Sequence, residues 1–184
     1  ADYDGDRKAD YAIWRPSNGN WYFRGSTNVF QVHQWGQQGD IPQVGDYNGD
    51  GTADFIIYRP SNGTWYVKTT TNDFIIFQFG IPTDTPLAAD YDGDGRVDAA
   101  VFRSGTWYIK GSTSGFRVTN FGQNGDVPVP ADYDGDGAAD LAVYRNGTWF
   151  ALSATAYTVK QYGGNAGDVP VPADYDGDGK TDLA

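Results

Sequence analysis

The sequence has no cysteine, no methionine and no glutamate, and its single histidine is His33. Without cysteine, no disulfide framework holds the fold. Because glutamate is absent, all 24 acidic residues are aspartates. Aspartate is a poor helix former, so this bias argues against helices. No apolar run approaches the roughly 20 residues that a helix needs to span a bilayer. These absences exclude a disulfide-held scaffold and insertion into a membrane.

Basic residues are also few. The formal net charge is −11, with 13 lysines and arginines among 184 residues, so the basic patch of a nucleic-acid-binding protein is missing. Glycine, with 25 residues, and aromatic residues, at 16%, are abundant. This composition is typical of many short strands joined by tight turns.

An aspartate-rich motif, Asp-Tyr-Asp-Gly-Asp-Gly-x-x-Asp, occurs five times at intervals of 44, 44, 42 and 42 residues. We name the copies the first loop (residues 2–10), second loop (46–54), third loop (90–98), fourth loop (132–140) and fifth loop (174–182). They hold 19 of the 24 acidic residues, at loop positions 1, 3, 5 and 9. Carboxylates this close repel one another unless a cation lies among them. The sequence therefore predicts a repeat protein that binds metal ions.

The spacing defines four full repeats and a partial fifth. The repeats cover residues 2–45, 46–89, 90–131, 132–173 and 174–184. An arginine follows each of the first four loops at a fixed distance, and a tryptophan precedes each later loop at a fixed distance: Arg15, Arg59, Arg103 and Arg145, and Trp21, Trp65, Trp107 and Trp149. All variation in length falls between arginine and tryptophan. Length changes confined to one segment indicate a turn, because a slip within a strand would invert its faces.

Each repeat predicts four short strands and no helix. Asn18-Gly19, Asn62-Gly63 and Asn146-Gly147 are hairpin signals, because both residues tolerate positive φ. They join Tyr11–Arg15 to Trp21–Arg24, and Leu141–Arg145 to Trp149–Leu152. The third strand is predicted at runs such as Phe74–Phe79 and Phe116–Phe121, and the fourth, before each loop, at Val127–Ala131 and Val169–Ala173.

The strand after each loop is apolar on both faces, as Leu141–Arg145 illustrates. Such a strand fits a sheet packed between two neighbouring sheets. We therefore predict an all-β fold of tandem four-stranded β-propeller-type blades with calcium loops.

Calcium prefers six to eight hard oxygen ligands, and alternate aspartates on a curled loop supply them. The predicted side-chain ligands are Asp2, Asp4, Asp6 and Asp10; Asp46, Asn48, Asp50 and Asp54; Asp90, Asp92, Asp94 and Asp98; Asp132, Asp134, Asp136 and Asp140; and Asp174, Asp176, Asp178 and Asp182. The predicted backbone carbonyl ligands, at position 7, are those of Lys8, Thr52, Arg96, Ala138 and Lys180. An EF-hand would place a glutamate at position 12, where this chain has an aliphatic strand residue, so the aspartate at position 9 must replace it. Magnesium, which demands a stricter octahedron, fits less well.

Two loops depart from the motif. The first loop has Arg7 where glycine is expected, and the second loop has Asn48 where aspartate is expected. We expect lower calcium affinity at both, because one bend is strained and the other loop has one charge fewer. The alternative interpretation is that Asp-Gly runs are merely solvated turns, but five copies at fixed spacing argue against it.

The loops, together with the segment Phe-Gly-x-x-Gly-Asp-x-Pro-Val-Pro-Ala that ends at Ala131, resemble the FG-GAP/VCBS repeat of integrin alpha chains and many secreted bacterial proteins. The resemblance implies a calcium ion held by the loop carboxylates, an extracellular setting, and adhesion or ligand binding. It implies no single activity, because propellers host many functions.

Other candidate sites are weaker. A triad of His33 with a serine such as Ser26 lacks a nucleophile elbow, and the paired acids that a glycosidase needs are committed to the loops. The four arginines are interpreted as braces for neighbouring carboxylates or carbonyls. Trp21-Tyr22, Trp65-Tyr66 and Trp107-Tyr108 offer rings for stacking on sugars, although strand alternation turns one ring of each pair toward the core.

The first repeat lacks the strand that precedes a loop, which Val169–Ala173 could supply, while 174–184 duplicates 2–12. This surplus leaves three alternatives: part of a longer array, a ring with one frayed end, or a contact with a further copy that propagates into a filament. The leading hypothesis is a non-enzymatic, secreted or cell-surface calcium-binding repeat protein for adhesion, surface structure or self-assembly. The alternatives are a lectin-like carbohydrate-binding propeller and an accessory domain of a secreted hydrolase; protein ligands also remain open.

Overall fold

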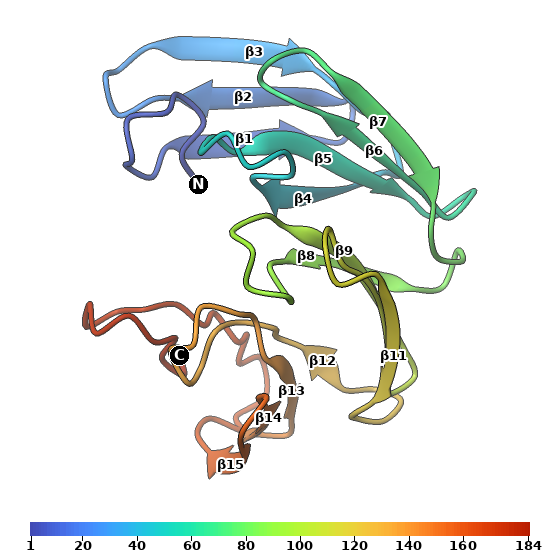
Figure 1. Ribbon diagram of the computed structural model, residues 1–184, viewed down its shortest axis with the longest axis vertical. Helices are drawn as coiled ribbons and strands as arrows, with labels where there is room; N and C mark the ends of the chain where they lie inside the picture. Colours follow the sequence, from blue (N-terminus) through green and yellow to red (C-terminus); the bar gives the residue numbers. More distant parts are fainter. The chain divides into compact units, whose positions relative to one another are not determined.

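The computed structural model describes residues 1–184 and is all-β, with fifteen strands and no helix (Figure 1). The strands are β1 Tyr11–Arg15, β2 Asn20–Arg24, β3 Phe30–Gln34, β4 Ile41–Gly45, β5 Asp54–Arg59, β6 Thr64–Lys68, β7 Phe74–Gln78, β8 Thr85–Ala89, β9 Asp98–Arg103, β10 Thr106–Lys110, β11 Phe116–Asn120, β12 Val127–Pro128, β13 Leu141–Arg145, β14 Thr148–Leu152 and β15 Tyr157–Gln161. The predicted all-β fold of antiparallel, blade-like sheets is confirmed, whereas calcium binding by the loops stays a prediction. No helix has the length and apolar character needed to cross a bilayer.

The strands form four antiparallel sheets whose strands follow chain order: β1-β2-β3, β4-β5-β6-β7, β8-β9-β10-β11 and β12-β13-β14-β15. Each four-stranded sheet begins with the strand before a loop and continues with the strand after it. The first sheet has three strands, so its predicted lack of a leading strand is confirmed. Residues 169–173 do not supply one: Ala173 bridges to Asp182, and the N–H of Val171 donates to the carbonyl of Ala184 at 2.9 Å. The segment therefore pairs with the strand remnant of its own loop.

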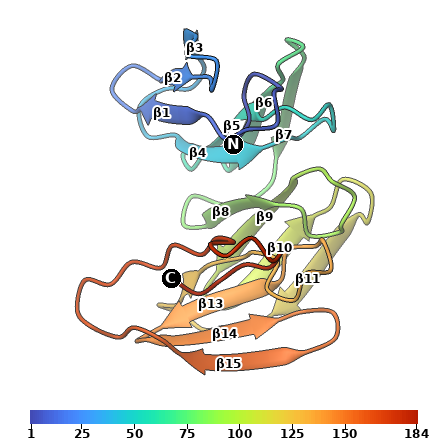
Figure 2. The ribbon, with the colours of Figure 1, turned by 90° about the vertical axis from the view of Figure 1, so that its left-hand side faces the viewer.

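The chain divides into two compact units, Ala1–Ala88 and Ala89–Ala184, and each is described by itself. In the second unit, β13, β14 and β15 lie side by side (Figure 2), with Val143 opposite Phe150 and Phe150 opposite Val159. This register holds the fourth loop at one end of β13.

The strand after the loop is buried in the second, third and fourth sheets. In β5 the four residues from Phe55 to Tyr58 are at most 3% exposed, and β9 and β13 have the same buried pattern. Burying each such side chain contributes roughly 1.5–3 kcal/mol. β1 differs, because Tyr11 is 84% exposed and Ile13 is 66% exposed. The apolar pattern after a loop therefore predicts that a strand forms, whereas burial of that strand depends on what packs against it.

In the first unit, aromatic rings join the first two sheets. Trp21 and Phe23 from β2 meet Phe55 and Ile57 from β5, with Tyr3 of the first loop between them. The Tyr3 ring stacks on Phe23 at 5.4 Å and on Phe55 at 5.7 Å between centroids. The tyrosine at loop position 2 thus anchors the loop in the core.

The fixed tryptophan of each repeat closes its sheet. Its indole N–H donates to a carbonyl just after the third strand, at 3.0 Å from Trp21 to Trp35, 2.9 Å from Trp65 to Phe79, 2.8 Å from Trp107 to Phe121 and 3.0 Å from Trp149 to Tyr162. All four tryptophans are buried. The prediction that one ring of each Trp-Tyr pair faces the core is confirmed.

Two of the four fixed arginines brace the segment before the loop, as predicted. The Arg59 guanidinium bonds both oxygens of Asp40 at 2.8 and 2.9 Å, and Arg145 bonds both oxygens of Asp126 at 2.5 and 2.6 Å. The two carboxylates are 1% and 0% exposed. Arg59 also lies 4.3 Å from the centroid of the Tyr66 ring, which adds a cation–π contact.

The hairpin turns differ in detail from the prediction. Asn146 and Gly147 have φ of 47° and 83° in a two-residue turn, as expected, and Ser104-Gly105, which the sequence did not single out, does the same at 48° and 90°. In the longer turns, however, only the glycine is left-handed: Gly19 has a φ of 66°, and the N–H groups of Asn18 and Gly19 both donate to the carbonyl of Arg15. The two extra residues in these turns create a wider loop that leaves asparagine in an ordinary conformation.

Candidate calcium loops

Each loop is curled by its first carboxylate. In the third loop, Asp90 accepts the N–H groups of Gly93 and Gly95, both at 2.7 Å. These glycines have φ of 74° and 85°, which favours residues without a Cβ. The aspartate at position 5 then accepts the N–H of position 7, at 2.9 Å from Arg96 to Asp94. The same pattern repeats in the other loops.

The aspartate at position 9 ties the loop to its own sheet. It accepts the N–H of the tyrosine at position 2 in all five loops, at 2.7 to 3.0 Å. In the first three loops its other oxygen accepts an N–H from the turn between the second and third strands, donated by Ser26, Thr70 and Ser112. A carboxylate keeps further lone pairs after two such bonds, so its role as a metal ligand remains a prediction.

Four loops bring three carboxylates together, with one oxygen of each residue within 4.8 Å of the others. The clusters are Asp2, Asp4 and Asp6; Asp90, Asp92 and Asp94; Asp132, Asp134 and Asp136; and Asp174, Asp176 and Asp182. Position 9 joins a cluster only in the fifth loop, where Asp178 stays outside. The second loop, which contains Asn48, forms no cluster of three carboxylates.

Asp92 provides a test of whether a cation fits. Its Oδ2 accepts N–H groups from Thr113 and Ser114 and the Thr113 hydroxyl, at 2.8 to 3.1 Å. Its Oδ1 is buried and has no hydrogen-bond partner. An unpaired buried oxygen is costly, and a cation beside Asp90 and Asp94 would satisfy it. This hard oxygen donor set fits calcium.

In the second, third and fourth loops, the electrostatic surroundings disfavour the charge of the aspartate at position 9. Burial, followed by the charges of Asp134, Asp136 and Asp132, raises the pKa of Asp140 to about 6. Burial likewise raises the pKa of Asp54 and of Asp98. A divalent cation would oppose this effect by favouring the ionised carboxylates.

The structure adds a set of hydroxyl groups that the sequence reasoning missed. The turn between the second and third strands places the hydroxyls of Ser26, Thr70 and Ser112 on the position-5 aspartates, at 3.1 Å for Thr70 to Asp50 and 2.6 Å for Ser112 to Asp94. The available signal was the cluster of serine and threonine after each second strand.

Neighbouring loops within a unit are joined by single backbone bonds. The N–H at position 8 donates to the position-1 carbonyl of the preceding loop, at 2.6 Å from Ala53 to Asp2, 2.6 Å from Ala139 to Asp90 and 2.7 Å from Thr181 to Asp132. The same peptide group contributes the predicted carbonyl ligand at position 7. One rigid peptide plane therefore links two adjacent loops.

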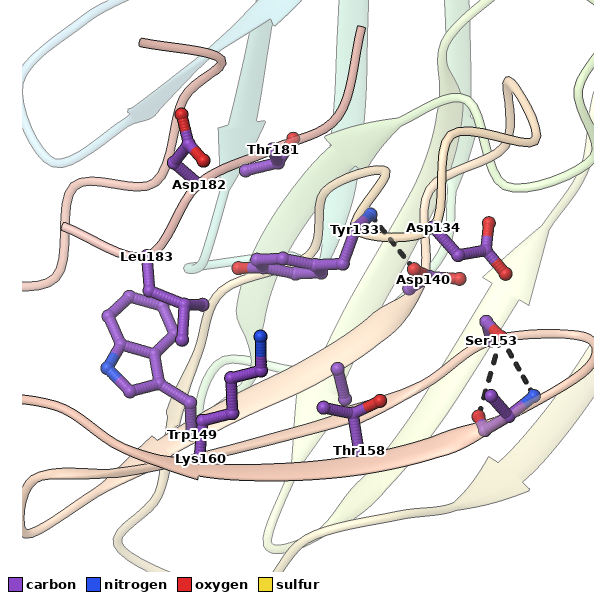
Figure 3. Close-up of a pocket in the computed structure, with 12 residues that line it drawn as sticks. Tyr133, Asp134, Asp140, Trp149, Ser153, Thr158, Lys160, Thr181, Asp182 and Leu183 are labelled. Atoms are coloured by element: carbon purple, nitrogen blue, oxygen red, sulfur yellow. Dashed lines mark hydrogen bonds between the residues drawn. The ribbon is translucent and has the colours of Figure 1, made fainter. Parts of the chain in front are cut away.

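A cleft lies beside the fourth loop in the second unit, with a volume of about 250 Å³. Figure 3 shows the Tyr133 ring within it, Trp149, Lys160 and Leu183 to one side, and Asp134 and Asp140 to the other. The first unit has a matching cleft of about 270 Å³ beside the first loop, in which His33 and Phe23 occupy the positions of Lys160 and Ala151.

His33 lies in this second cleft as a stacking partner. Its ring is 4.8 Å from that of Phe55 and contacts the side chain of Gln31 at 3.2 Å, whereas the Ser26 hydroxyl donates to Asp6. Burial, followed by the charge of Lys68, lowers the pKa of His33. The two members of the conceivable triad thus have other partners.

The sheets have the architecture of β-propeller blades, and comparison with known proteins places the chain in a family. The FG-GAP-like repeat matches at residues 2–57 and 46–101. The chain belongs to the FG-GAP-like repeat family. No curated protein matches the sequence.

Among solved structures, the chain is similar to a lectin of Agrocybe aegerita, which is described as specifically recognising non-reducing terminal N-acetylglucosamine. The TM-score is 0.64 at 17% identity. The likeness covers 96% of this chain and 57% of the lectin chain. At this identity the likeness concerns the fold alone.

Proposed function

We propose that the protein is a non-enzymatic, calcium-binding repeat protein that acts outside the cell in adhesion, surface structure or self-assembly. The observation that carries the proposal is the buried, unpartnered Oδ1 of Asp92 within a cluster of three carboxylates. Membership of the FG-GAP-like family is consistent with it.

In this proposal the carboxylates at positions 1, 3 and 5 hold the ion, and position 9 or the position-7 carbonyl completes the oxygen set. Calcium neutralises charges that the loops cannot otherwise bring together, so its binding energy adds to the stability of the fold. Five ions would bring ten positive charges against a net charge of −11.

The proposed extracellular location rests on the calcium affinity expected of the loops. Calcium modules that work outside cells bind at roughly 10⁻⁴ to 10⁻³ M. The loop residues at positions 1, 3 and 5 are half-buried or exposed, and sites of this kind at the surface would fill only where calcium is abundant.

The test is thermal unfolding with calcium and with excess chelator. We expect calcium to raise the melting temperature strongly and magnesium to do so much less. An unchanged melting temperature on chelation would refute the proposal.

Carbohydrate binding is the second candidate, favoured by the cleft at the fourth loop. Trp149 and Tyr133 offer ring surfaces there, and Lys160, Asp134 and Thr158 offer polar groups; aromatic rings with a few polar groups are typical of ligand pockets. The similarity to a lectin fold points the same way.

A glycan array with calcium present tests this candidate. We expect bound glycans to be lost in Lys160→Ala and retained in Lys110→Ala, because Lys110 does not line the cleft. An array without any bound glycan would count against carbohydrate binding while leaving the calcium proposal untouched.

A further inference from the structure

The third and fourth loops carry the same residues at positions 1 to 6 and 9, and each brings three carboxylates together. The motif alone therefore predicts two equal calcium sites. The two sites differ in the turn that connects the second and third strands of the same sheet and contacts the loop. We name it the loop-facing turn, and it comprises residues 25–28, 69–72, 111–114 and 153–156 in the four repeats.

In the third repeat, the loop-facing turn holds one oxygen of the position-3 aspartate with three donors. Asp92 Oδ2 accepts the N–H groups of Thr113 and Ser114 at 3.1 and 2.8 Å, and the Thr113 hydroxyl at 3.0 Å. Successive N–H groups in a turn form a concavity that binds an anion. The other oxygen of Asp92, Oδ1, is buried and has no partner. The turn therefore fixes the carboxylate in an orientation that leaves Oδ1 available to a cation.

In the fourth repeat, a serine hydroxyl takes up the donors of the loop-facing turn. The N–H groups of Thr155 and Ala156, at the same places in the repeat as the two N–H donors of the third, donate to Ser153 Oγ at 3.2 and 3.0 Å. From this turn Asp134 accepts a long hydrogen bond of 3.4 Å, donated by the Thr155 hydroxyl. The turn therefore binds its own N–H groups and holds the position-3 carboxylate weakly.

The first residue of the loop-facing turn accounts for the difference. It is Gly111 in the third repeat and Ser153 in the fourth. A Cβ on Gly111 would lie 2.9 Å from Asp92 Oδ2 and 2.2 Å from Ser114 Oγ. The turn and the carboxylate can approach this closely because glycine places no side chain between them. A serine at this position would also bring a hydroxyl that competes for the two N–H groups.

The first two repeats divide in the same way. In the first repeat, a Cβ on Gly25 would lie 2.2 Å from Asp4 Oδ2, so this aspartate also lies against a glycine. In the second repeat the first residue of the turn is Thr69, whose hydroxyl accepts the N–H of Asp73, just after the turn, at 3.0 Å. Glycine thus accompanies a carboxylate held against the turn, and a hydroxyl residue accompanies a turn that binds its own N–H groups.

We propose that the first residue of the loop-facing turn controls how tightly its loop binds calcium: glycine lets the turn fix the position-3 carboxylate, whereas serine withdraws the donors. The inference rests on the proposed calcium function. Gly111 and Thr113 are positioning residues, since they act on the ion through Asp92. A ligand that is already oriented loses less conformational freedom on binding, and hydrogen-bond partners of metal ligands change metal affinity by about 10- to 100-fold.

Calcium titration of the full chain, followed by the amide signals of Gly95 and Gly137, measures the third and fourth loops separately. We expect the third loop to bind calcium about tenfold more tightly than the fourth. Equal affinities would overturn the inference while supporting the proposed calcium function. Signals that respond to calcium at neither loop would refute the calcium function and the inference together.

A reciprocal pair of variants assigns the difference to the turn. We expect Gly111→Ser to weaken calcium binding at the third loop about tenfold. Ser153→Gly should strengthen binding at the fourth loop, a gain that misfolding cannot produce. The first loop serves as the internal control for both variants. Unchanged affinity at the third loop in Gly111→Ser would overturn the inference.

The Thr113 hydroxyl provides a conservative test that leaves the backbone of the turn intact. Thr113→Val removes this donor from Asp92 Oδ2, whereas Thr113→Ser keeps it. We expect Thr113→Val to weaken calcium binding at the third loop about tenfold and Thr113→Ser to bind as the wild-type chain does. An equal loss in both variants would indicate a merely structural role, and a loss in neither would contradict positioning of Asp92 by this hydroxyl.

Discussion

Arg7 illustrates how one side chain can weaken a repeated site. Its φ is 66°, close to the 85° to 90° of the glycines at the same position in the other loops. A left-handed conformation is strained for a residue with a Cβ, by about 1 kcal/mol or more. The fold holds Arg7 there because Asp2 accepts its N–H at 2.6 Å.

Replacing Arg7 with glycine should stabilise the chain by about 1 kcal/mol in chelator. It should also raise calcium affinity at the first loop, because a positive charge leaves the site. Urea unfolding and calcium titration measure the two effects. Arg7→Ala is the control that removes the charge and keeps the strain: it should improve affinity alone, and a stability gain equal to that of glycine would contradict the strain argument.

Asp140 makes stability depend on pH in a direction opposite to that of a salt-bridged carboxylate. Its pKa is about 6 in the folded chain, against an ordinary value of 3.8. The folded state therefore holds this proton more tightly than the unfolded state does. The contribution of Asp140 to the free energy of unfolding is present below pH 3.8 and is lost as pH rises through 6.

In chelator, the free energy of unfolding of the wild-type chain should fall by up to about 3 kcal/mol between pH 4 and pH 7, relative to that of Asp140→Asn. Urea unfolding at a series of pH values measures this difference. Saturating calcium should remove or reverse it, because the ion favours the ionised form. A difference that is flat with pH in chelator would show that Asp140 titrates normally.

At the scale of elements, pairs of a half-buried arginine and a buried aspartate fix the strand after the loop to the segment before the sheet. Asp126 is fully buried, and the hydrogen bonds from Arg145 outweigh burial and leave its pKa lowered. Removing one partner leaves an uncompensated charge in the interior.

Arg145→Ala should destabilise the second unit by about 3 kcal/mol or more. Arg15→Ala in β1 is the matched control, because Arg15 is exposed and contacts the ring and hydroxyl of Tyr22. Unfolding in denaturant gives both values. Combining Arg145→Ala with Asp126→Asn should recover part of the loss, and a fully additive loss would count against coupling of the pair.

The peptide groups that join adjacent loops predict cooperativity between elements. Ala139 and Thr181 link the third, fourth and fifth loops through the carbonyls of Asp90 and Asp132. Asp136→Asn should therefore weaken calcium binding at the third and fifth loops about fivefold or more, the usual lower range for coupled sites. The amide signals of Gly93 and Gly177 report these loops during a titration. The first loop serves as the internal control, and an equal loss there would indicate a general effect on folding.

At the scale of the whole molecule, the two units differ in which faces they leave exposed. The strand after the loop is buried in the second, third and fourth sheets, but in the first sheet Tyr11 and Ile13 of β1 are exposed and the strand pairs only with β2. An exposed apolar strand at a sheet edge favours association.

We expect the chain to associate as its concentration rises, and Ile13→Lys to weaken this association at least tenfold. Sedimentation at several concentrations measures it. Gln38→Lys adds the same charge at an exposed turn and should leave the association unchanged. A wild-type chain that stays monomeric at high concentration would argue against self-assembly through this face.

Much of the fold could be predicted because its signals are local and repeated. The fixed places of Arg15 and Trp21 within the repeat defined the turn between β1 and β2, and alternation of apolar residues defined the strands. The turn at Asn18-Gly19 was assigned the wrong geometry, because two inserted residues changed the loop rather than the dipeptide itself. The hydroxyls of Ser26 and Ser112 were missed, because contacts between a turn and a loop depend on strand register.

The sequence by itself determined the all-β repeat, the five curled loops and the position of each aspartate within them, because glycine conformation and strand alternation act over a few residues. Only the tertiary structure decided which carboxylates meet. It tied Asp98 to backbone amides, left Asp92 with an unpaired buried oxygen, and gave Asp50 an internal set of donors. These differences arise because burial and hydrogen bonding depend on neighbouring strands and turns that lie far apart in the chain.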